Sequence, residues 1–493
     1  MRKQRFIYPV LLAALLSGCS LIPNYERPDT QTPAGWNEAD ASQPTVIAKD
    51  WWKNFNSVEL NALMEEALAN NNDLGAAIAR VEQARGLLKA QGASLLPSVD
   101  GTGNVGWDKI NPGKGKSTDD ASYSAGLSVG YELDLFGMNR AEIESAAQDL
   151  EASGFSKDAT ALIVMGDVAK GYFNVLNLQE RLAIADKNLK SSRELLRIVQ
   201  ARFDAGATTA LDVSQQKSDL GTTEANRAAI ELQLKIAKSA LAVLVGKPPQ
   251  ALQVASTNMN SLVVPNIAPG QPSTLLERRP DIRSAEASLI GANADIGAAR
   301  AAFYPNVTLG LDWTIGASPW GDPATTALSL ASGIVQPIFK GGLLQGNLDY
   351  SKGRRAELVQ NYRKTVLTSF KDVEDALATV KTSAQRETSL ETAANEARKA
   401  YDLSKQQYDV GSIDFQILLD SQQTMLLAED NYVQTRNERL AAAVDLYKAL
   451  GGGWAENSKS VETPAQPVQV TKPATTQKPV EMFPAESKPA VQQ

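Results

Sequence analysis

Apolar and small residues recur at alternating steps of four and three along Met138–Asp204, a stretch without proline. The series runs through Leu178, Leu182, Ala185, Leu189, Ser192, Leu196, Val199 and Phe203. Such a heptad seam predicts one helix of about 67 residues, which is about 100 Å long at 1.5 Å per residue. A turn is expected at Ala205-Gly206-Ala207-Thr208-Thr209, and helical composition resumes over residues 211–245. The pattern therefore predicts an antiparallel helical hairpin over residues 138–245.

Upstream of this hairpin the period changes to two. At residues 121–135 the odd positions are apolar or aromatic, whereas the even positions carry serine, glycine or an acidic residue. Residues 97–109 alternate in the same way, though less regularly. Both stretches predict strands with one apolar face, each longer than the 9 to 11 residues or so that cross a hydrocarbon layer. A helix is expected before them, over residues 58–95.

The second half of the chain repeats the first. Asp281 and Pro305 have the same spacing as Asp73 and Pro97. Strands are predicted at about 305–316 and 326–338, followed by a helical hairpin at 341–450 that turns at Gly411-Ser412. These correspondences indicate an internal duplication, with repeats at 57–246 and 277–454. A proline-rich connector at 247–276 should pack beside the helices, and the Pro, Thr, Gln and Lys-rich tail at 455–493 is expected to be disordered.

The N-terminal residues have the composition of an export signal. Arg2, Lys3 and Arg5 precede an apolar run at 10–16, and Leu16-Ser17-Gly18-Cys19 follows, typical of a lipobox. This predicts a signal peptide at 1–18 and a covalent lipid on Cys19, and the alternative is an ordinary signal peptide with a chance cysteine. Residues 19–56 then form a lipidated tether, whose Trp51, Trp52 and Phe55 are expected to pack in a belt around the helices.

Composition excludes several classes of function. The net charge is −7 and the pI about 5.1, so no basic surface for nucleic acid is expected. The chain has no histidine and one cysteine, which removes His-dependent catalysis, His-ligated metals and intrachain disulfides. Residues 113–118 look like a phosphate loop, but the required first glycine is Ile110 and no helix follows. We expect no enzyme, no metal and no cofactor other than the lipid.

The four predicted strands raise a problem of closure. Four strands cannot close a barrel, and open sheet edges are not tolerated in lipid. The strands must therefore come together from several copies of the chain, and three copies of four strands each would supply twelve, above the minimum of about eight. The alternation alone does not determine that number. The alternative is a pair of soluble β-hairpins packed on the helices.

Four motifs carry a resemblance to a known family: Pro23-Asn24-Tyr25-Glu26-Arg27-Pro28, Glu132-Leu133-Asp134-Leu135-Phe136-Gly137, Arg279-Pro280-Asp281-Ile282 and Leu450-Gly451-Gly452-Gly453-Trp454. With the duplicated hairpins, they resemble the TolC-like outer membrane factors, specifically the NodT-type or OprM-like lipoprotein branch. The resemblance implies a mainly α fold with transmembrane β-strands. It further implies a homotrimer in which a 12-stranded β-barrel in the outer membrane joins a periplasmic α-helical barrel.

The same resemblance implies partners and a function. A periplasmic adaptor and an inner-membrane transporter of the RND or ABC type would complete a tripartite efflux system that passes drugs and toxic small molecules through the duct. Secretion of proteins by a type I system, or of peptides or siderophores, remains an alternative, as does a passive porin. The pump chooses most of the cargo, so this sequence does not name it.

The resemblance implies a periplasmic gate at Asp212, Asp420, Tyr408 and Gln416. Tyr408 matches an aromatic residue of the tip, and Gln416 departs from the family because some relatives have an apolar residue there. Carboxylate rings in a narrow neck would repel one another and attract cations. The alternative is that Asp212 favours a helix N-terminus and Asp420 is a solvated residue. The expected adaptor contacts are the tip residues Gly206, Ala207, Thr208, Gly411, Ser412 and Ile413.

Overall fold

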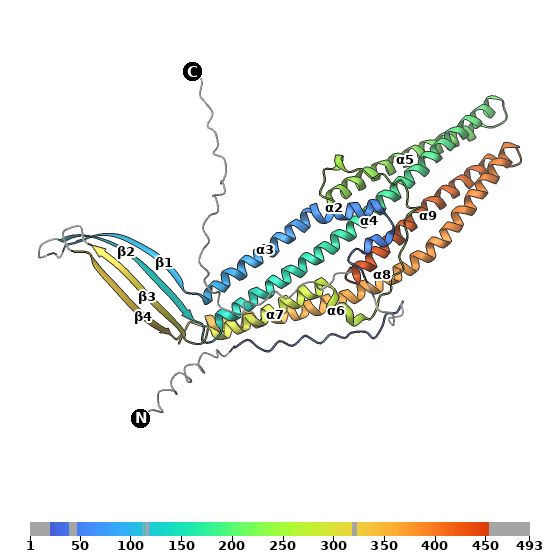
Figure 1. Cartoon of the computed structure of the whole chain (residues 1–493). Helices are drawn as coiled ribbons and strands as arrows, with labels where there is room; N and C mark the ends of the chain where they lie inside the picture. The colour runs from blue at the N-terminus through green and yellow to red at the C-terminus, as the bar shows by residue number, and fades with distance from the viewer. Residues whose placement is uncertain (1–19, 39–46, 112, 114–117, 318–322, 453–493) are drawn as a thin grey trace, which may run out of the picture. The chain divides into compact units, whose positions relative to one another are not determined.

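The computed structural model describes residues 20–38, 47–111, 113, 118–317 and 323–452. Each half contributes two strands and one long helical hairpin (Figure 1). The long helices α4 (Met138–Asp204) and α8 (Leu343–Asp409) both have 67 residues, and their partners α5 (Ala210–Leu244) and α9 (Phe415–Ala449) both have 35. The two predicted hairpins are confirmed, with the identical lengths that an internal duplication leaves. None of the described helices combines the length and apolar composition needed to cross a bilayer.

The predicted seam of α4 is buried along most of its length. Leu178, Leu189, Ser192 and Val199 are buried, whereas Phe203 is 40% exposed. The buried part of the seam therefore ends at Val199, one turn earlier than predicted.

The strands form one antiparallel sheet in the order β1 (Ser98–Ile110), β2 (Thr118–Leu133), β3 (Asn306–Ala317) and β4 (Thr325–Val335). Pairing of β2 with β3 joins the two repeats. Strand β4 ends three residues before the predicted end at 338, because Pro337 has no N–H for the ladder. Strand β2 likewise ends before Leu135.

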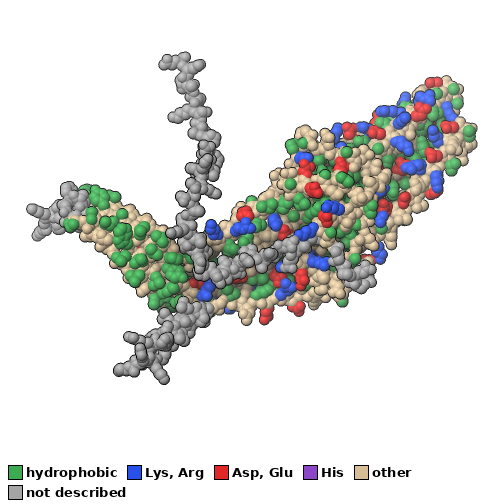
Figure 2. Space-filling model, in the orientation of Figure 1, with side chains coloured by type: hydrophobic (Ala, Val, Ile, Leu, Met, Phe, Trp, Pro, Cys, Tyr) green, Lys and Arg blue, Asp and Glu red, His purple; other side chains and the backbone are tan. Residues whose placement is uncertain are grey.

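The two faces of this sheet differ as the alternation predicted. Leu127, Trp313 and Leu328 stand side by side on the apolar face, and the register places Ser128, Asp312 and Ser329 together in the next row. Within the polar row, Ser128 Oγ donates to Asp312 Oδ1 at 2.6 Å. Figure 2 shows hydrophobic side chains gathered over the strands, whereas Lys, Arg, Asp and Glu gather over the helical hairpins. The apolar face is thus open in a single chain.

The prediction of one helix over 58–95 is wrong in one respect, because the helix is interrupted at Asn71. Helix α2 (Val58–Asn70) is separated from α3 (Asn72–Gly92) by this residue, whose backbone is extended. The Asn71 side chain accepts a hydrogen bond from Leu74 N at 3.0 Å, so it caps α3. A short 3-10 helix, η2 (Ala93–Leu95), completes the segment.

The belt residues Trp51, Trp52 and Phe55 pack in a buried cluster against the middle of the long helices. In η1 (Trp51–Phe55), Trp51 stacks on Tyr447 at 4.8 Å between ring centroids, and Phe55 packs on Phe173 at 5.0 Å. Met259 and Leu262 of the connector belong to the same buried cluster. The belt and the connector therefore pack beside the helices as the sequence indicated. The connector contains η3 (Pro249–Ala251) and η4 (Pro272–Thr274) and leads to α6 (Leu275–Arg278).

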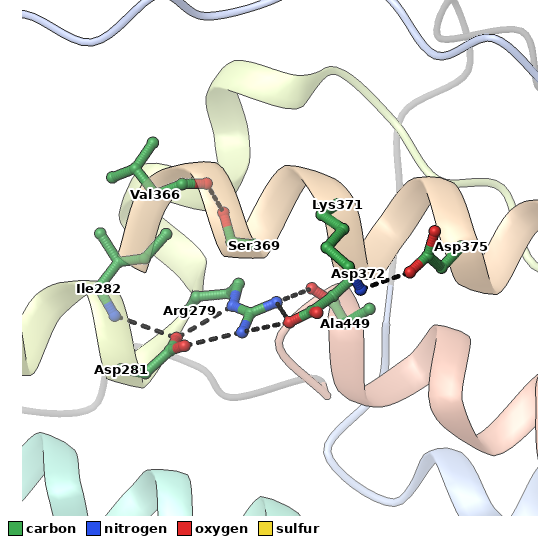
Figure 3. Close-up of polar contacts among 9 residues, drawn as sticks. All are labelled: Arg279, Asp281, Ile282, Val366, Ser369, Lys371, Asp372, Asp375 and Ala449. Atoms are coloured by element: carbon green, nitrogen blue, oxygen red, sulfur yellow. Dashed lines mark hydrogen bonds and ion pairs between the residues drawn. The ribbon is translucent and has the colours of Figure 1, made fainter. Parts of the chain in front are cut away.

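Two equivalent junctions join helices end to end. At the first, Asn71 Nδ2 donates to Leu244 O at the end of α5, at 2.8 Å. At the second, Arg279 precedes α7 (Pro280–Ala301) and donates from Nη1 to Ala449 O at the end of α9, at 3.2 Å. Figure 3 shows the Arg279 guanidinium between that carbonyl and the carboxylates of Asp281 and Asp372. The two repeats thus make the same helix-to-helix bond, one with an amide and the other with a guanidinium.

The N-terminal segment at 20–28 lies along α7. Arg27 forms a bidentate ion pair with Glu286 at 2.7 and 2.8 Å, and Pro23 O accepts from Asn293 Nδ2 at 2.6 Å. Near the end of α7, a Cβ on Gly297 would stand 2.5 Å from Ile22 Cγ1, so only glycine admits the segment there. The motif around Tyr25 and Arg27 therefore fastens the segment to the helix. Cys19, the signal peptide at 1–18 and the tail at 455–493 lie outside the described residues.

Candidate functional site

Both hairpin turns end their long helix in the same way. Gly206 and Gly411 have φ of +72° and +77°, a left-handed conformation that favours glycine. Ala207 N donates to Arg202 O at 2.8 Å, and Ser412 N donates to Gln407 O at 2.9 Å, which are the bonds of a Schellman motif. The tip residues expected to contact an adaptor lie in these two turns. Gly206, Ala207, Gly411 and Ser412 are exposed, and Thr208 and Ile413 are half-buried.

Asp212 is the carboxylate of a capping box. Its Oδ2 accepts from Thr209 N at 3.0 Å, and Thr209 Oγ1 accepts from Asp212 N at 3.3 Å. A further short hydrogen bond comes from Thr208 Oγ1. The bonds from Thr208 and Thr209 lower the pKa of Asp212. The carboxylate therefore stays ionised and holds the start of α5.

Gln416 and Asp420 are exposed and lie one turn apart on α9. Gln416 Nε2 donates to Asp420 Oδ1 at 2.8 Å. No contact joins Asp212 to Asp420 within the described residues of one chain. A gate made from these carboxylates would have to bring different copies together.

Tyr408 is the buried member of the predicted gate. It is 3% exposed and packs against Phe415, with ring centroids 5.8 Å apart. Burial raises the pKa of the Tyr408 phenol, so it stays neutral. The cluster around it includes Val199 and Leu418, which come from different hairpins. Tyr408 therefore lies where the two hairpins meet near their tips.

The sequence reasoning missed Arg202, which links the hairpins. Its guanidinium carbon lies 4.2 Å from the centroid of the Tyr408 ring, and Nη2 donates to Tyr408 O at 3.1 Å. The sequence shows that Arg202 is a basic residue in the last turn of α4, a position that favours contact with helix carbonyl groups. It does not show that the carbonyl group contacted belongs to α8, the other long helix. A second link lies nearer the belt, where Arg181 forms a bidentate pair with Asp430 at 2.5 and 3.2 Å.

Duplicated strands and helical hairpins with linked tips are also found in a known protein family. The family model described as "Outer membrane efflux protein" matches residues 63–247 and 271–452. The chain belongs to the outer membrane efflux protein family. The two matched segments correspond closely to the two repeats of the structure.

This outer membrane efflux protein has close relatives over nearly its whole length. It is 38% identical over 457 residues to the pyoverdine export outer membrane protein OpmQ of Pseudomonas aeruginosa, covering 91% of this chain and 96% of the relative. It is 35% identical over 475 residues to outer membrane protein OprJ of the same species, covering 94% and 98%. The solved structure of the CmeC outer membrane channel of Campylobacter jejuni matches with a TM-score of 0.82 and 27% identity, over 89% of this chain and 96% of that one.

The resemblance inferred from the motifs is therefore confirmed. This outer membrane efflux protein is a TolC-like efflux channel of the outer membrane that extends into the periplasm. Its relatives are outer membrane channel proteins.

Proposed function

We propose that three copies of this chain assemble into one continuous duct of a tripartite efflux system. The observation that carries the proposal is the four-stranded sheet, in which β1 and β4 each have one neighbour among the described strands. Unpaired strand edges are unfavourable in lipid, and a large open apolar face is unfavourable in water. Closing β4 of one copy against β1 of the next covers every edge, and twelve strands make a barrel with its apolar face toward lipid.

The helical hairpins continue the duct into the periplasm. Their tips carry exposed turn residues in two equivalent copies per chain, which suits docking of a periplasmic adaptor with a repeated binding surface. The duct itself has no source of energy. An inner-membrane transporter of the RND or ABC type supplies direction, and the chain acts as a conduit and not as an enzyme.

The gate of the duct is the group of residues at and beside the tips. Asp420 and Gln416 are exposed and free to meet their counterparts in other copies, whereas Tyr408 and Asp212 maintain the local structure that presents them. The Arg202 contact with Tyr408 holds the two hairpins of one chain together. Opening separates the hairpins and changes these contacts.

A lipid on Cys19 anchors each chain beside the barrel. Support comes from the N-terminal segment, since Leu21 O accepts from Arg300 Nη1 at 3.3 Å, close to the end of α7 at Ala301. Strand β3 begins only a few residues later, at Asn306. The described segment thus begins beside the base of the sheet, where the membrane surface would lie.

The cargo class is small molecules, with drugs and toxic compounds as the first candidate. Export of a siderophore is the second candidate, because OpmQ is named for pyoverdine export and aligns over 91% of this chain. Transport assays in a host that lacks its own channels separate the two. Expression with each candidate pump and adaptor should restore efflux of a labelled drug or of a labelled siderophore.

Single-channel recording tests the duct and its gate. The purified full-length protein should have the mass of three copies and should conduct ions in a planar bilayer. Asp420→Ala should raise the conductance, and Asp402→Ala, an exposed carboxylate two turns before the tip, should not. A monomer without conductance would contradict the duct, and an unchanged Asp420→Ala channel would remove Asp420 from the gate.

A further inference from the structure

Among the described strands, β1 and β4 are the two outer members of the sheet (Figure 1). At its centre, β2 of the first repeat pairs with β3 of the second, and we call this pairing the central boundary. A boundary between the second repeat of one copy and the first repeat of the next would join β4 to β1, the equivalents of β2 and β3. The central boundary therefore offers a template for the contact between copies.

The strands of the two repeats can be aligned residue by residue. Counting back from the first residues of α4 and α8 aligns β2 with β4, and counting forward from the prolines before β1 and β3 aligns those strands. The hairpin registers agree with this alignment. Val99 pairs with Val129 in the first hairpin, and the equivalent residues Val307 and Ile334 pair in the second.

At the base of the sheet, the central boundary pairs Leu133 with Val307. The equivalents of these residues are Ile338, just beyond the end of β4, and Val99 near the start of β1. Both are open in one chain, with exposed fractions of 87% and 64%. A second copy in the same register would bring these two apolar residues opposite each other.

Further along the strands, the central boundary pairs Ala125 with Ile315. Their equivalents are Leu330 on β4 and Trp107 on β1. Both are large apolar residues that are exposed in one chain. The template thus sets apolar residues of one edge against apolar residues of the other at two places.

The polar face follows the same register. The row next to Leu330 brings Ser329 opposite Asp108 of the next copy, and a serine and an aspartate, Ser128 and Asp312, also meet at the central boundary. A slip by one residue would set the polar rows of one copy against the apolar rows of the other. The smallest slip that keeps the faces together is therefore two residues.

The helices next to these strands show a matching pair of residues. At the central boundary, α4 and α7 approach so closely that a Cβ on Gly291 would stand 3.4 Å from Gln148 Cβ. The equivalent of Gly291 on α3 is Gln83, and the equivalent of Gln148 on α8 is Gly353, so glycine and glutamine exchange sides. In one chain Gln83 is exposed, and no described atom lies within 4 Å of a Cβ built on Gly353.

We propose that copies of this chain join through β4 and α8 of one copy and β1 and α3 of the next, in the register of the central boundary. Leu330 then lies opposite Trp107 of the next copy, and Gly353 receives Gln83 of the next copy. This inference rests on the proposed duct and adds the residue register of its chain boundaries. Since shear and strand number together determine the diameter of a barrel, that register also sets the bore of the duct.

Disulfide formation in the full-length protein measures the register. One variant combines Leu330→Cys with Trp107→Cys, and another combines Ser329→Cys with Asp108→Cys. These pairs lie in successive rows of an antiparallel ladder, which alternate between two geometries, so one of them has the shorter distance that a disulfide needs. At least one variant should give a reducible band at the mass of three copies after oxidation, and the single-cysteine variants should not.

The matched controls move the cysteine on β4 by two residues, to Leu328 or Ser332 against Trp107→Cys and to Ala327 or Ala331 against Asp108→Cys. Each control should cross-link about tenfold less than the pair it matches, because diagonal neighbours are about 7 Å or more apart. Stronger cross-linking of a control would overturn the register, and so would a trimeric protein in which no predicted pair cross-links. A wild-type protein that does not trimerise would instead contradict the duct.

An exchange of residues tests the helix contact independently. Gly353→Gln should weaken trimer assembly about tenfold, because two glutamines overfill the close approach. Glutamine favours a helix more than glycine does, so a weaker helix could not explain that loss. Adding Gln83→Gly should restore most of the assembly, because it reproduces the arrangement of Gln148 and Gly291.

Sedimentation of the detergent-solubilised variants measures the trimeric fraction. Gln83→Gly alone is the matched control, because it removes a side chain without adding a clash, and it should assemble better than Gly353→Gln. Unchanged assembly of Gly353→Gln, or no restoration in the double variant, would overturn the close approach of α8 to α3 of the next copy.

Discussion

Asp212 shows how a single side chain can determine where a helix begins. Its carboxylate accepts three hydrogen bonds from Thr208 and Thr209, so the start of α5 depends on its charge. These bonds also restrict the carboxylate, which limits how far it could move toward a counterpart in another copy. Within the described residues the Asp420 carboxylate has one hydrogen-bond partner, the Gln416 amide, so fewer bonds restrict it.

The lowered pKa of Asp212 makes the first tip sensitive to acid. A depressed pKa in the folded state means that the stabilisation is present above the usual carboxyl pKa of 3.8 and is lost as the pH falls through the folded value. Amide exchange of residues 207–213, corrected for intrinsic rates, should therefore lose protection below about pH 4. At pH 6, Asp212→Asn should reduce protection about fivefold, near the 1 kcal/mol or so of a helix cap. An Asp212→Asn protein with the wild-type acid response would show that another group is responsible.

At the scale of elements, the two end-to-end junctions connect the end of α5 to the start of α3 and the end of α9 to the start of α7. Gly246 and Gly451 come shortly after α5 and α9 and have φ of +74° and +89°. A Cβ on Gly246 would stand within 3 Å of Asn70 O, and a Cβ on Gly451 would stand within 3 Å of Arg278 O. The close approach brings the carbonyl end of one helix to the N-terminus of the next, so their dipoles align. The two junctions thus have the same backbone geometry but different bridging side chains, Asn71 in the first repeat and Arg279 in the second.

Removal of Arg279 should loosen the second junction. Its side chain is 11% exposed and binds Asp281, Asp372 and Ala449 O, so Arg279→Ala should lower local stability by about 2 kcal/mol, the range of hydrogen bonds to charged groups. Amide exchange at 446–450 and 280–286 would measure the change. Lys371→Ala is the control, because its pair with Asp375 is exposed and contributes little. Equal exchange in both variants would mean that backbone packing alone holds the junction.

For the whole molecule, the decisive question is what covers the sheet. Leu330 on the edge strand β4 is 81% exposed and lies on the apolar face, while the adjacent Ser329 belongs to the row of Asp312 and Ser128 on the polar face. In a membrane barrel these two neighbours face lipid and water, respectively. In a soluble sheet both would face water.

Arginine scanning at these two positions tests the orientation. Leu330→Arg should impair insertion into the outer membrane, since a cation on the lipid face near the midplane costs about 2 to 4 kcal/mol. Ser329→Arg should insert normally and alter ion selectivity. Insertion is measured by the amount of protein in the outer membrane fraction and by the difference in gel mobility between heated and unheated samples. Normal insertion of Leu330→Arg with failure of Ser329→Arg would reverse the assignment of the faces.

The sequence alone determined the helical hairpins, the strands and the duplication, because heptads and alternation are local patterns that survive without knowledge of neighbours. It placed the ends of α4 at Met138 and Asp204, but it missed the break at Asn71 and the early end of β4 at Val335. It named Asp212 and Tyr408 as site residues and gave a helix N-terminus as the alternative for Asp212, but it did not show that Tyr408 is a buried contact between hairpins.

Only the tertiary structure decided the contacts between distant segments. Arg202 meets Tyr408, Arg279 meets Ala449, and Arg181 meets Asp430, all of them pairs separated by well over a hundred residues. Periodicity indicates which face of a helix is covered and not which partner covers it, so no local pattern identifies these pairs. The physical reason is that a helix offers the same stripe to any complementary neighbour, and packing of the complete chain selects one.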